Sequence, residues 1–496
     1  MPPLTDTTTF DYAIIGAGFG GIIAALKLQE LGKTSFVILE RAADIGGTWR
    51  DNVYPGCACD VASNLYSISS RPNPAWSHTY SRQPEIWQYL KNVVQQSDLV
   101  PHLRCNAEVI RAEFREAEGR WFIFDRLGRL TIARMLLCAP GTLNRPNKPV
   151  FQGMEGFQGD IVHSAEWRTD VALAGKRVAV IGTGASAIQI VPAIAAEVKY
   201  LSVVQRTPAW ILPRHDKPTS RFRQRLFARF PALQRALRQL IFFANEAGGI
   251  SFVKEMQQMR RIVAWYALRH LKRQVQNPEL RRNLTPSYTL GCKRVLVSDD
   301  FYPTFNQPNV FLETAPIQEF TKQGLCFMDG REEAFDVIIL ATGFHASDGQ
   351  WSMEICGLGG KRLMEEWQKT GAEAYFGTTV ADFPNMALLL GPNTGGGHNS
   401  VLDTMESQMH YVAQYIRALD ALPQGAFLNL RYDVQTAYNQ RLQKMFAGTV
   451  WSSGCKSWYM NAEGKNTTIY PHLNSHFRKA TRRLNASDYA VLMPTV

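Results

Sequence analysis

Several classes of protein are excluded by what this 496-residue sequence lacks. No apolar run reaches the length of about 20 residues that a membrane-spanning helix needs. The first ten residues, MPPLTDTTTF, have no basic stretch followed by an apolar core, so no secretory signal is expected there. Hydrophobic residues make up 45% and charged residues 20% of the chain, which is typical of a globular enzyme with two or three domains.

Cysteine pairs with the CxxC spacing are also missing. The eight cysteines are scattered and form no CxxC pair, so the sequence predicts neither a zinc site nor a disulfide framework. We therefore expect reduced thiols in a cytoplasmic protein. His345 and His398 lie near glycines, and neither has a second candidate ligand at a useful spacing, so no metal site is expected.

The net charge of +11 is concentrated in one part of the chain. Between Arg214 and Arg282 there are 16 Lys and Arg but only 4 Asp and Glu. Apolar residues recur there at intervals of three and four, which predicts amphipathic helices over about 214–285. We favour a helical insertion with a solvated basic face, and the alternative is a peripheral contact with an anionic membrane. No nucleic-acid-binding motif accompanies the charge.

A glycine-rich loop near the start of the chain has the pattern of a dinucleotide site. DYAIIG at 11–16 predicts a buried strand, and IIAALKLQELG predicts a helix after the loop. Between them lies GxGxxG on Gly16, Gly18 and Gly21, which allows a tight turn and a close approach of a pyrophosphate. The next predicted strand, SFVILE, ends on Glu40, whose carboxylate can accept hydrogen bonds from a ribose diol.

The same pattern recurs at 176–206. The predicted strand KRVAVIG enters a second loop, and its small residues are Gly182, Gly184 and Ala187. Arg206 lies 24 residues after Gly182, as Glu40 lies 24 residues after Gly16. Arg206 with Thr207 suits a ribose 2′-phosphate, whereas a carboxylate suits a free ribose. The first loop therefore predicts an unphosphorylated adenine dinucleotide, and the second loop predicts NADP.

A hydride donor needs an acceptor, so we expect the first dinucleotide to be FAD and the second to be NADPH. After an antiparallel-looking section at 108–125, LLCAPG at 136–141 is expected to lead into the second unit, and DVIILATGF at 336–344 to lead back. The predicted fold is α/β, with two Rossmann-like domains and the NADP domain nested within the FAD domain. The predicted FAD domain comprises 1–144 and 335–496, and the NADP domain comprises 145–334 with its helical insertion.

Two longer motifs resemble those of the type I Baeyer–Villiger monooxygenases, which belong to the class B flavoprotein monooxygenases. FQGDIVHSAEW at 157–167 matches the fingerprint F-x-G-x-x-x-H-x-x-x-W, although Arg168 follows where the family usually has Pro or Asp. GGTWRDNVYPGCACD at 46–60 matches a second family motif. Related flavin-containing monooxygenases carry Tyr or Phe at the position of Trp167. The resemblance runs from about residue 10 to the end of the chain.

The resemblance implies an NADPH- and O2-dependent flavoprotein that converts ketones to esters or lactones through a C4a-peroxyflavin. It implies that Arg294 is the fixed positive charge that keeps the peroxide deprotonated, with Asp60 as its partner. Lys293 is expected to join Arg206 at the NADP phosphate, and His163 to link the two domains rather than act as a base. The identity of the ketone, and whether the protein is a monomer or a homodimer, stay open.

The predicted cofactor contacts follow the two loops and the family motifs. For FAD they are Gly16, Gly18, Phe19, Gly21, Glu40, Arg41, Gly47, Thr48, Trp49, Asp60, Val61, Tyr66, Val109 and Asn393. For NADP they are Gly182, Thr183, Gly184, Ala185, Ser186, Gln189, Arg206, Thr207, Lys293 and Trp458.

Three other functions are compatible with parts of this pattern. A flavin-dependent enzyme that oxidises nitrogen or sulfur would use a protonated hydroperoxide and would not need Arg294. A pyridine-nucleotide disulfide reductase would need a redox pair, for which Cys57 and Cys59 offer a CxC spacing. A nucleotide sensor or a membrane-bound scaffold would bind the dinucleotides without turnover. Trp167 and the motif that ends at Asp60 favour the Baeyer–Villiger reaction over oxidation of nitrogen or sulfur, and the same motif already accounts for the segment of Cys57 and Cys59.

Overall fold

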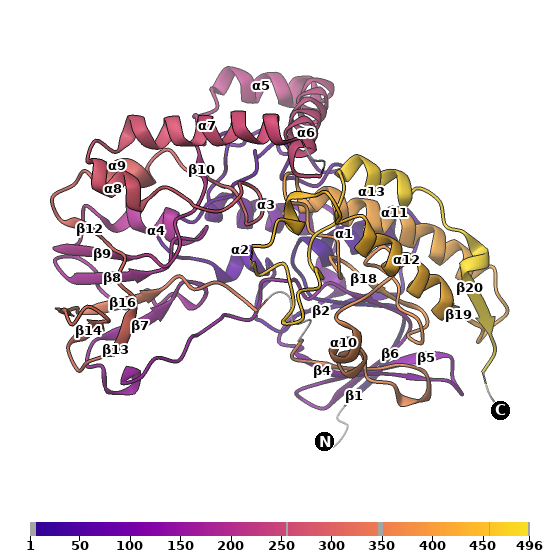
Figure 1. The fold of residues 1–496 in the computed structure, drawn as a ribbon. Helices are drawn as coiled ribbons and strands as arrows, with labels where there is room; N and C mark the ends of the chain where they lie inside the picture. Colours follow the sequence, from indigo (N-terminus) through magenta and orange to yellow (C-terminus); the bar gives the residue numbers. More distant parts are fainter. Residues whose placement is uncertain (1–5, 254–255, 346–350, 456, 495–496) are drawn as a thin grey trace.

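The fold is built on two sheets with parallel strands at their centres, and a helical segment lies across the top of Figure 1. The computed structural model describes residues 6–253, 256–345, 351–455 and 457–494. A five-stranded sheet lies on the left of Figure 1 and an eight-stranded sheet at its lower centre. The predicted α/β class with two Rossmann-like units is therefore confirmed.

The larger sheet has the strand order β17-β4-β5-β6-β1-β2-β3, and β18 pairs with β6. Its strands are β1 (Asp6–Ile15), β2 (Phe36–Leu39), β3 (Leu103–Arg104), β4 (Val109–Arg115), β5 (Arg120–Asp125), β6 (Arg129–Cys138), β17 (Glu354–Cys356) and β18 (Met386–Leu388). β1 pairs in parallel with β2 and β6. β4 and β5 form the antiparallel section that the sequence predicts at 108–125, and β6 continues it by pairing with β5. All four residues of β2 are apolar and buried, as expected for a strand covered on both faces.

Helices cover the larger sheet. α1 (Phe19–Glu30) begins at the end of the first glycine-rich loop and contacts both β1 and α11 (Val401–Asp420). The other elements of this half are α2 (Thr48–Asp51), α3 (Gln83–Gln96), α10 (Leu363–Thr370), α12 (Tyr432–Lys444), α13 (Asn474–Ala480) and the hairpin of β19 (Phe427–Leu430) with β20 (Tyr489–Leu492).

The smaller sheet is parallel throughout, in the order β12-β9-β8-β16-β7. Its strands are β7 (Asp160–His163), β8 (Arg177–Ile181), β9 (Tyr200–Val204), β12 (Val310–Glu313) and β16 (Val337–Leu340). α4 (Ala187–Ile194) follows β8 and packs against α9 (Phe301–Thr304). A three-stranded antiparallel sheet adjoins it, with strands β13 (Ile317–Phe320), β14 (Gly324–Phe327) and β15 (Glu332–Ala334).

The return from the second unit to the first lies later than predicted. The stretch 336–344 contains β16, which pairs with β7 and β8 in the smaller sheet. The chain rejoins the larger sheet only at β17, which pairs with β4. The predicted boundary at 335 is therefore wrong, because a short apolar strand suits the centre of either parallel sheet and its pattern does not say which.

The helices predicted over 214–285 are present. They are α5 (Arg221–Arg229), α6 (Pro231–Val253), α7 (Gln257–Gln274) and α8 (Pro278–Asn283). The short parallel pair of β10 (Ile211–Leu212) and β11 (Leu296–Val297) joins the two ends of this segment. Within the described residues, no helix combines the length and the apolar character needed to cross a membrane.

Candidate functional site

Both glycine-rich loops line one cavity of about 1270 Å³. Most of the predicted site residues also line it, although they come from segments far apart in the sequence. They are Gly16, Gly18, Phe19, Glu40, Arg41, Gly47, Thr48, Trp49, Asp60, Val61, Tyr66, Val109, Gly182, Thr183, Gly184, Ala185, Ser186, Gln189, Arg206, Thr207, Lys293, Arg294 and Trp458. Gly21 and Asn393 do not line the cavity.

Gly21 packs helix α1 against the turn before it. A Cβ atom at Gly21 would lie 1.8 Å from the carbonyl oxygen of Gly16, so no other residue fits there. Gly16 itself has a φ of 95°, in the region that favours glycine. This packing places the first turn of α1 at the cavity wall, where Phe19 lies, while Gly21 faces the protein interior.

Glu40 lies at the end of β2 and is 4% exposed. Its Oε2 accepts a hydrogen bond from the backbone N–H of Ala17 at 2.8 Å, and its Oε1 accepts one from Ala42 at 3.0 Å. Arg50 Nη1 lies 2.8 Å from the same Oε1. The carboxylate is therefore held rigidly at the cavity. The prediction missed Arg50, although it directly follows Trp49 in the second family motif.

The GGTW segment closes the cavity around this carboxylate. A Cβ atom at Gly18 would lie 3.7 Å from the Cα atom of Gly47, so the two loops approach each other backbone to backbone. Trp49 is buried, and its Nε1 donates to the hydroxyl of Tyr66 at 3.0 Å. Because Gly18 and Gly47 have no side chains, a pyrophosphate can approach the backbone there, and the fixed carboxylate of Glu40 can bind a ribose. This arrangement fits an adenine dinucleotide.

The second loop is tied to both halves of the molecule. Thr183 Oγ1 donates to the carbonyl oxygen of Thr207 at 2.9 Å, which links the loop to the end of β9. Gln189 on α4 donates to the carbonyl oxygen of Ala58 at 3.0 Å and accepts from the hydroxyl of Tyr54 at 3.1 Å. The side-chain amide of Gln189, predicted to contact NADP, therefore bridges the smaller sheet to the motif at 46–60.

Arg206 and Lys293 bring two positive charges to one region of the cavity wall. Burial, reinforced by the charge of Arg206, lowers the pKa of Lys293. The ammonium of Lys293 lies 4.9 Å from the ring centroid of Tyr288. Among the described residues, no carboxylate lies within 4.0 Å of either cation, so this part of the cavity fits an anion such as a phosphate.

Arg294 and Asp60 form an ion pair in the cavity wall. Nη2 of Arg294 lies 2.6 Å from Oδ2 of Asp60, and its Nε lies 3.1 Å from the same oxygen. The two side chains are 39% and 26% exposed, and both line the cavity. The charge of Asp60 raises the pKa of Arg294. Burial opposes ionisation of Asp60, yet the guanidinium of Arg294 lowers its pKa, so both groups are ionised.

A second guanidinium, which the sequence did not predict, lies close to this pair. Arg214 Nη2 donates to the carbonyl oxygen of Cys59 at 3.0 Å, and its charge also lowers the pKa of Asp60. Its backbone N–H donates to Asp299 at 2.8 Å. Nothing in the sequence distinguishes Arg214 from the other basic residues at the start of the helical segment.

A disulfide joins two segments of the cavity wall. Cys292 and Cys455 are bonded, with their Cα atoms 6.3 Å apart. The expectation that all cysteines are reduced thiols is therefore wrong for this pair, because 163 residues separate them and no spacing signals the contact. The bond holds the segment of Lys293 and Arg294 close to the segment of Trp458.

Trp458 and Tyr459 follow that disulfide. Trp458 lines the cavity and is 42% exposed, and its ring centroid lies 4.5 Å from that of Tyr459. Burial raises the pKa of Tyr459 to about 12, and the positive charge of Arg294 opposes this shift. Tyr459 is therefore a neutral phenol near Arg294.

The CxC pair carries no disulfide. Cys57 and Cys59 are both free thiols that line the cavity. Burial raises the pKa of Cys57 to about 11, and it raises that of Cys59 further. A reductase needs a reactive thiolate, and these thiols are held in the neutral form.

His163 lies outside the cavity lining, at the end of β7. It is buried, its Nδ1 accepts from the backbone N–H of Ala165 at 3.1 Å, and burial lowers its pKa. Its ring packs edge-on against Phe344, which pairs with Pro146 in an isolated bridge. The two connections between the sheets thus run side by side next to His163, which agrees with a linking role.

Comparison with known proteins decides the family. The sequence matches the flavin-binding monooxygenase-like family over residues 10–350. It is 43% identical to a Baeyer–Villiger monooxygenase of Streptomyces coelicolor, over 97% of this chain and 92% of the relative. It is 42% identical to a Baeyer–Villiger monooxygenase of Pseudomonas aeruginosa, over 96% of this chain and 90% of the relative.

The chain belongs to the Baeyer–Villiger monooxygenases. Solved structures agree. OTEMO in complex with FAD and NADP superimposes with a TM-score of 0.87 at 26% identity, over 97% of this chain and 99% of that one. A closed form of cyclohexanone monooxygenase gives a TM-score of 0.86 at 27% identity, over 98% of this chain and all of that one. The family and the flavoprotein monooxygenase class predicted from the two motifs are confirmed.

The side chain of Asn393 is buried in this Baeyer–Villiger monooxygenase and bonds to a neighbouring segment. Its Nδ2 donates to the carbonyl oxygens of Asn466 and Ile469 at 2.8 and 2.9 Å, so it braces the segment after Trp458. The glycine-rich stretch around it reaches the cavity instead through Gly396 and Asn399.

Proposed function

We propose that this protein binds FAD and uses NADPH and O2 to convert ketones into esters or lactones. The observation that carries the proposal is the Arg294–Asp60 ion pair, which lies in the wall of a cavity that both glycine-rich loops share. Oxidation of nitrogen or sulfur needs an electrophilic oxygen, and no fixed cation is required for it. Attack on a ketone carbonyl needs a nucleophilic oxygen anion, and an adjacent permanent cation stabilises such an anion.

Two groups of residues would hold the cofactors. The first loop, Glu40 and the GGTW segment fit FAD, and the second loop with Arg206 and Lys293 fits NADPH. A solved relative in complex with FAD and NADP shares the fold over nearly the whole chain, which supports both assignments. When bound, FAD supplies the redox chemistry that passes electrons from NADPH to O2.

The protein's own contribution would be electrostatic. Arg294 stays protonated throughout, and Asp60 orients its guanidinium from one side through two hydrogen bonds to a single oxygen. The remaining N–H groups of Arg294 are then available to an oxygen atom that gains negative charge in the reaction. Trp458, which lines the cavity, and the buried Tyr459 near Arg294 would limit the access of water to this region.

A panel of cyclic, aryl and long-chain ketones tests the proposal when the organic product is identified directly. We expect a yellow protein that consumes NADPH faster with a ketone present and forms an ester or lactone with one oxygen atom from O2. NADPH consumption that yields only hydrogen peroxide, or sulfoxides without any ester, would contradict the proposed reaction.

A further inference from the structure

Helix α6 buries three large polar residues beside the apolar Phe242, and it exposes three large apolar residues. The buried polar residues recur every four to eight positions, and they are Gln234, Arg238 and Glu246. The exposed apolar residues recur at intervals of seven and three, and Leu233, Leu240 and Phe243 are 47%, 67% and 60% exposed. Each set lies on one face of the helix. A surface helix of a globular protein normally has the opposite arrangement.

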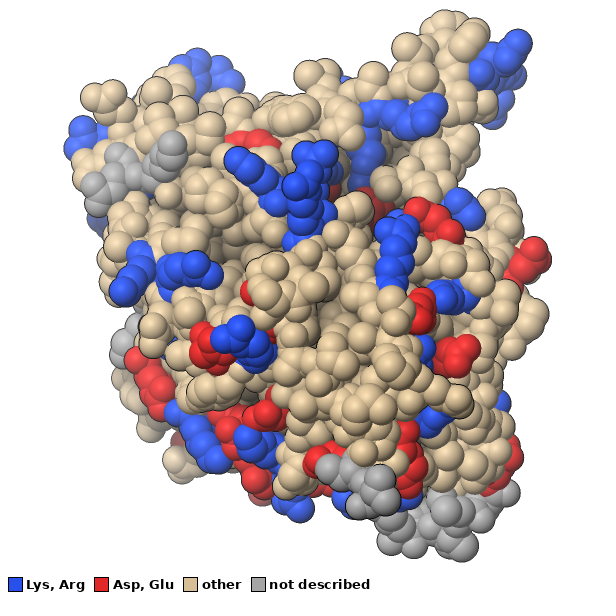
Figure 2. Space-filling model, turned by 90° about the vertical axis from the view of Figure 1, so that its right-hand side faces the viewer, with Lys and Arg blue, Asp and Glu red and all other residues tan. Residues whose placement is uncertain are grey.

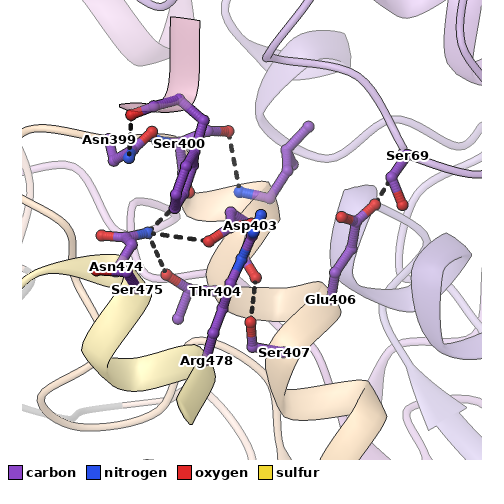
Figure 3. A network of polar contacts seen from close by, with 12 residues as sticks. Ser69, Asn399, Ser400, Asp403, Thr404, Glu406, Ser407, Asn474, Ser475 and Arg478 are labelled. Carbon is purple, nitrogen blue, oxygen red and sulfur yellow. Dashed lines mark hydrogen bonds and ion pairs between the residues drawn. The ribbon is translucent and has the colours of Figure 1, made fainter. Parts of the chain in front are cut away.

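Arg238 fixes this orientation from one end of α6. Its Nη1 donates to the carbonyl oxygens of Leu65 and Ser67, both at 2.7 Å, and its Nη2 lies 3.4 Å from Oε2 of Glu406 on α11. Glu406 also accepts from the backbone N–H of Ser69 at 2.6 Å, and Figure 3 shows these two residues side by side. A buried guanidinium with these partners cannot turn outward without losing them.

Glu246 fixes the orientation from the other end. Its Oε1 lies 3.0 Å from His398 Nε2 and accepts from Asn399 Nδ2 at 3.0 Å. Its Oε2 accepts from the backbone N–H of Ser475 at 2.9 Å, at the start of α13. Figure 3 shows how Asn399 and Ser475 converge in this polar network. The contacts of Arg238 and Glu246 therefore fix the orientation of α6, and this orientation leaves Leu233, Leu240 and Phe243 exposed.

The neighbouring helices extend the apolar surface. α5 and α7 both contact α6, and all three lie at the top of Figure 1. Their exposed apolar side chains are mainly aromatic. Phe222, Ile262, Trp265 and Tyr266 are 76%, 66%, 58% and 42% exposed, and Phe230, between α5 and α6, is 51% exposed.

Basic side chains surround these apolar ones. α5 contains no acidic residue, and the single acidic residue of α6, Glu246, is buried. The exposed arginines of α5 and α6 are Arg221, Arg223, Arg225, Arg229 and Arg235. In Figure 2, which keeps the same vertical axis, Lys and Arg predominate in the upper half of the visible face and most Asp and Glu lie below.

We propose that the outer face of α5, α6 and α7 binds the surface of an anionic lipid bilayer. Apolar and aromatic side chains would enter the boundary between headgroups and acyl chains, and the arginines would lie among anionic headgroups. A second copy of the chain fits this face less well, because a two-fold contact would bring the same arginines together. The helices would lie in the membrane surface and would not cross it.

Sedimentation of the holoenzyme with lipid vesicles tests the proposal. We expect binding to vesicles of phosphatidylglycerol and phosphatidylcholine at physiological salt, and at least tenfold weaker binding to phosphatidylcholine alone. The double variant Leu240→Gln with Phe243→Gln should reduce binding to the anionic vesicles at least tenfold. The matched control is Leu127→Gln, since Leu127 is 58% exposed and lies on the distant turn between β5 and β6. Both variants should retain FAD and NADPH-dependent turnover in solution.

The remaining outcomes would overturn the proposal. One is the absence of binding to the anionic vesicles. A second is a double variant that binds them as well as the wild-type protein does, which would show that the apolar face takes no part. A third is a wild-type dimer that the double variant converts to a monomer without any change in vesicle binding, which would identify a second copy as the occupant of this face.

Discussion

Replacing Arg206 with Ala should weaken the use of NADPH while it leaves the use of NADH nearly unchanged. Arg206 and Lys293 both line the cavity, and burial together with Arg206 lowers the pKa of Lys293. Among the described residues, no carboxylate lies within 4.0 Å of either cation. A ribose 2′-phosphate would supply the counter-charge that this pair lacks, and NADH has no such group.

The expected magnitude follows from the interaction that is removed. A hydrogen bond between a guanidinium and a phosphate contributes about 1.5–3 kcal/mol. This corresponds to a fall of roughly 10- to 150-fold in kcat/KM for NADPH. Removing Arg206 also removes one cause of the lowered pKa of Lys293, so Lys293 should stay protonated to higher pH in the variant. The affinity of the variant for NADPH, although weaker, should therefore begin to fall at a higher pH than that of the wild-type protein.

Steady-state kinetics with both nucleotides measure the effect. The matched control is Lys199→Ala, because Lys199 is an exposed cation of the same half of the molecule that does not line the cavity. It should change neither kcat/KM. If Arg206→Ala lowered kcat/KM equally for NADPH and NADH, the assignment of Arg206 to the phosphate would be refuted.

Three further predictions concern the ion pair, the polar network and the disulfide. Asp60→Asn should retain FAD but lower the rate of ester formation roughly fivefold, since a partly exposed ion pair with Arg294 contributes about 1 kcal/mol; unchanged ester formation would show that the pair is not used. Burial raises the pKa of Glu246, but the hydrogen bonds to its carboxylate outweigh this effect and lower the pKa from 4.5 to about 2. The stability that this carboxylate contributes is therefore present above pH 4.5 and is lost as the pH falls toward 2. The gap in unfolding free energy between wild type and Glu246→Gln, about 2–3 kcal/mol at neutral pH, should therefore shrink over that range, and a gap independent of pH would contradict this account. Thiol titration of the denatured protein should find six free cysteines before reduction and eight afterwards, and eight free thiols without reductant would exclude the bond. Reduction of Cys292–Cys455 should lower the free energy of unfolding by up to about 5 kcal/mol, because the loop that the bond closes spans 163 residues.

The parts of the fold that local sequence determines were predictable. Both strand–loop–helix units, the hairpin of β4 with β5 and the helices of the 214–285 segment have a clear periodicity or glycine pattern, and the structure contains each of them. The limits of strands depend on their partners instead. β1 begins at Asp6 rather than at residue 11 because Asp6 pairs with Arg129 on β6, and β16 joins the smaller sheet because of its neighbours β7 and β8.

The residues of the site also fall into those that local sequence predicts and those that depend on contacts between distant segments. Glycines of the loops and the charged ends of strands could be read from spacing, and they line the cavity. Contacts between distant segments could not. Arg50 reaches Glu40, Arg214 reaches the Asp60 segment, and Cys292 meets Cys455 only after the two sheets are in place. The sequence also did not predict which side of α6 is exposed, because an amphipathic period does not say which side of a helix is buried.

The measurement that tests the central claim most directly is product analysis for Arg294→Ala with a ketone that the wild-type enzyme oxidises. We expect this variant to retain FAD and still oxidise NADPH, but to form less than about one hundredth of the wild-type ester and to release hydrogen peroxide in its place. Arg294→Lys serves as the control, because it keeps the charge but loses the paired hydrogen bonds to Asp60, and its ester yield should lie between the two. A normal yield of ester from Arg294→Ala would contradict the role given to this guanidinium.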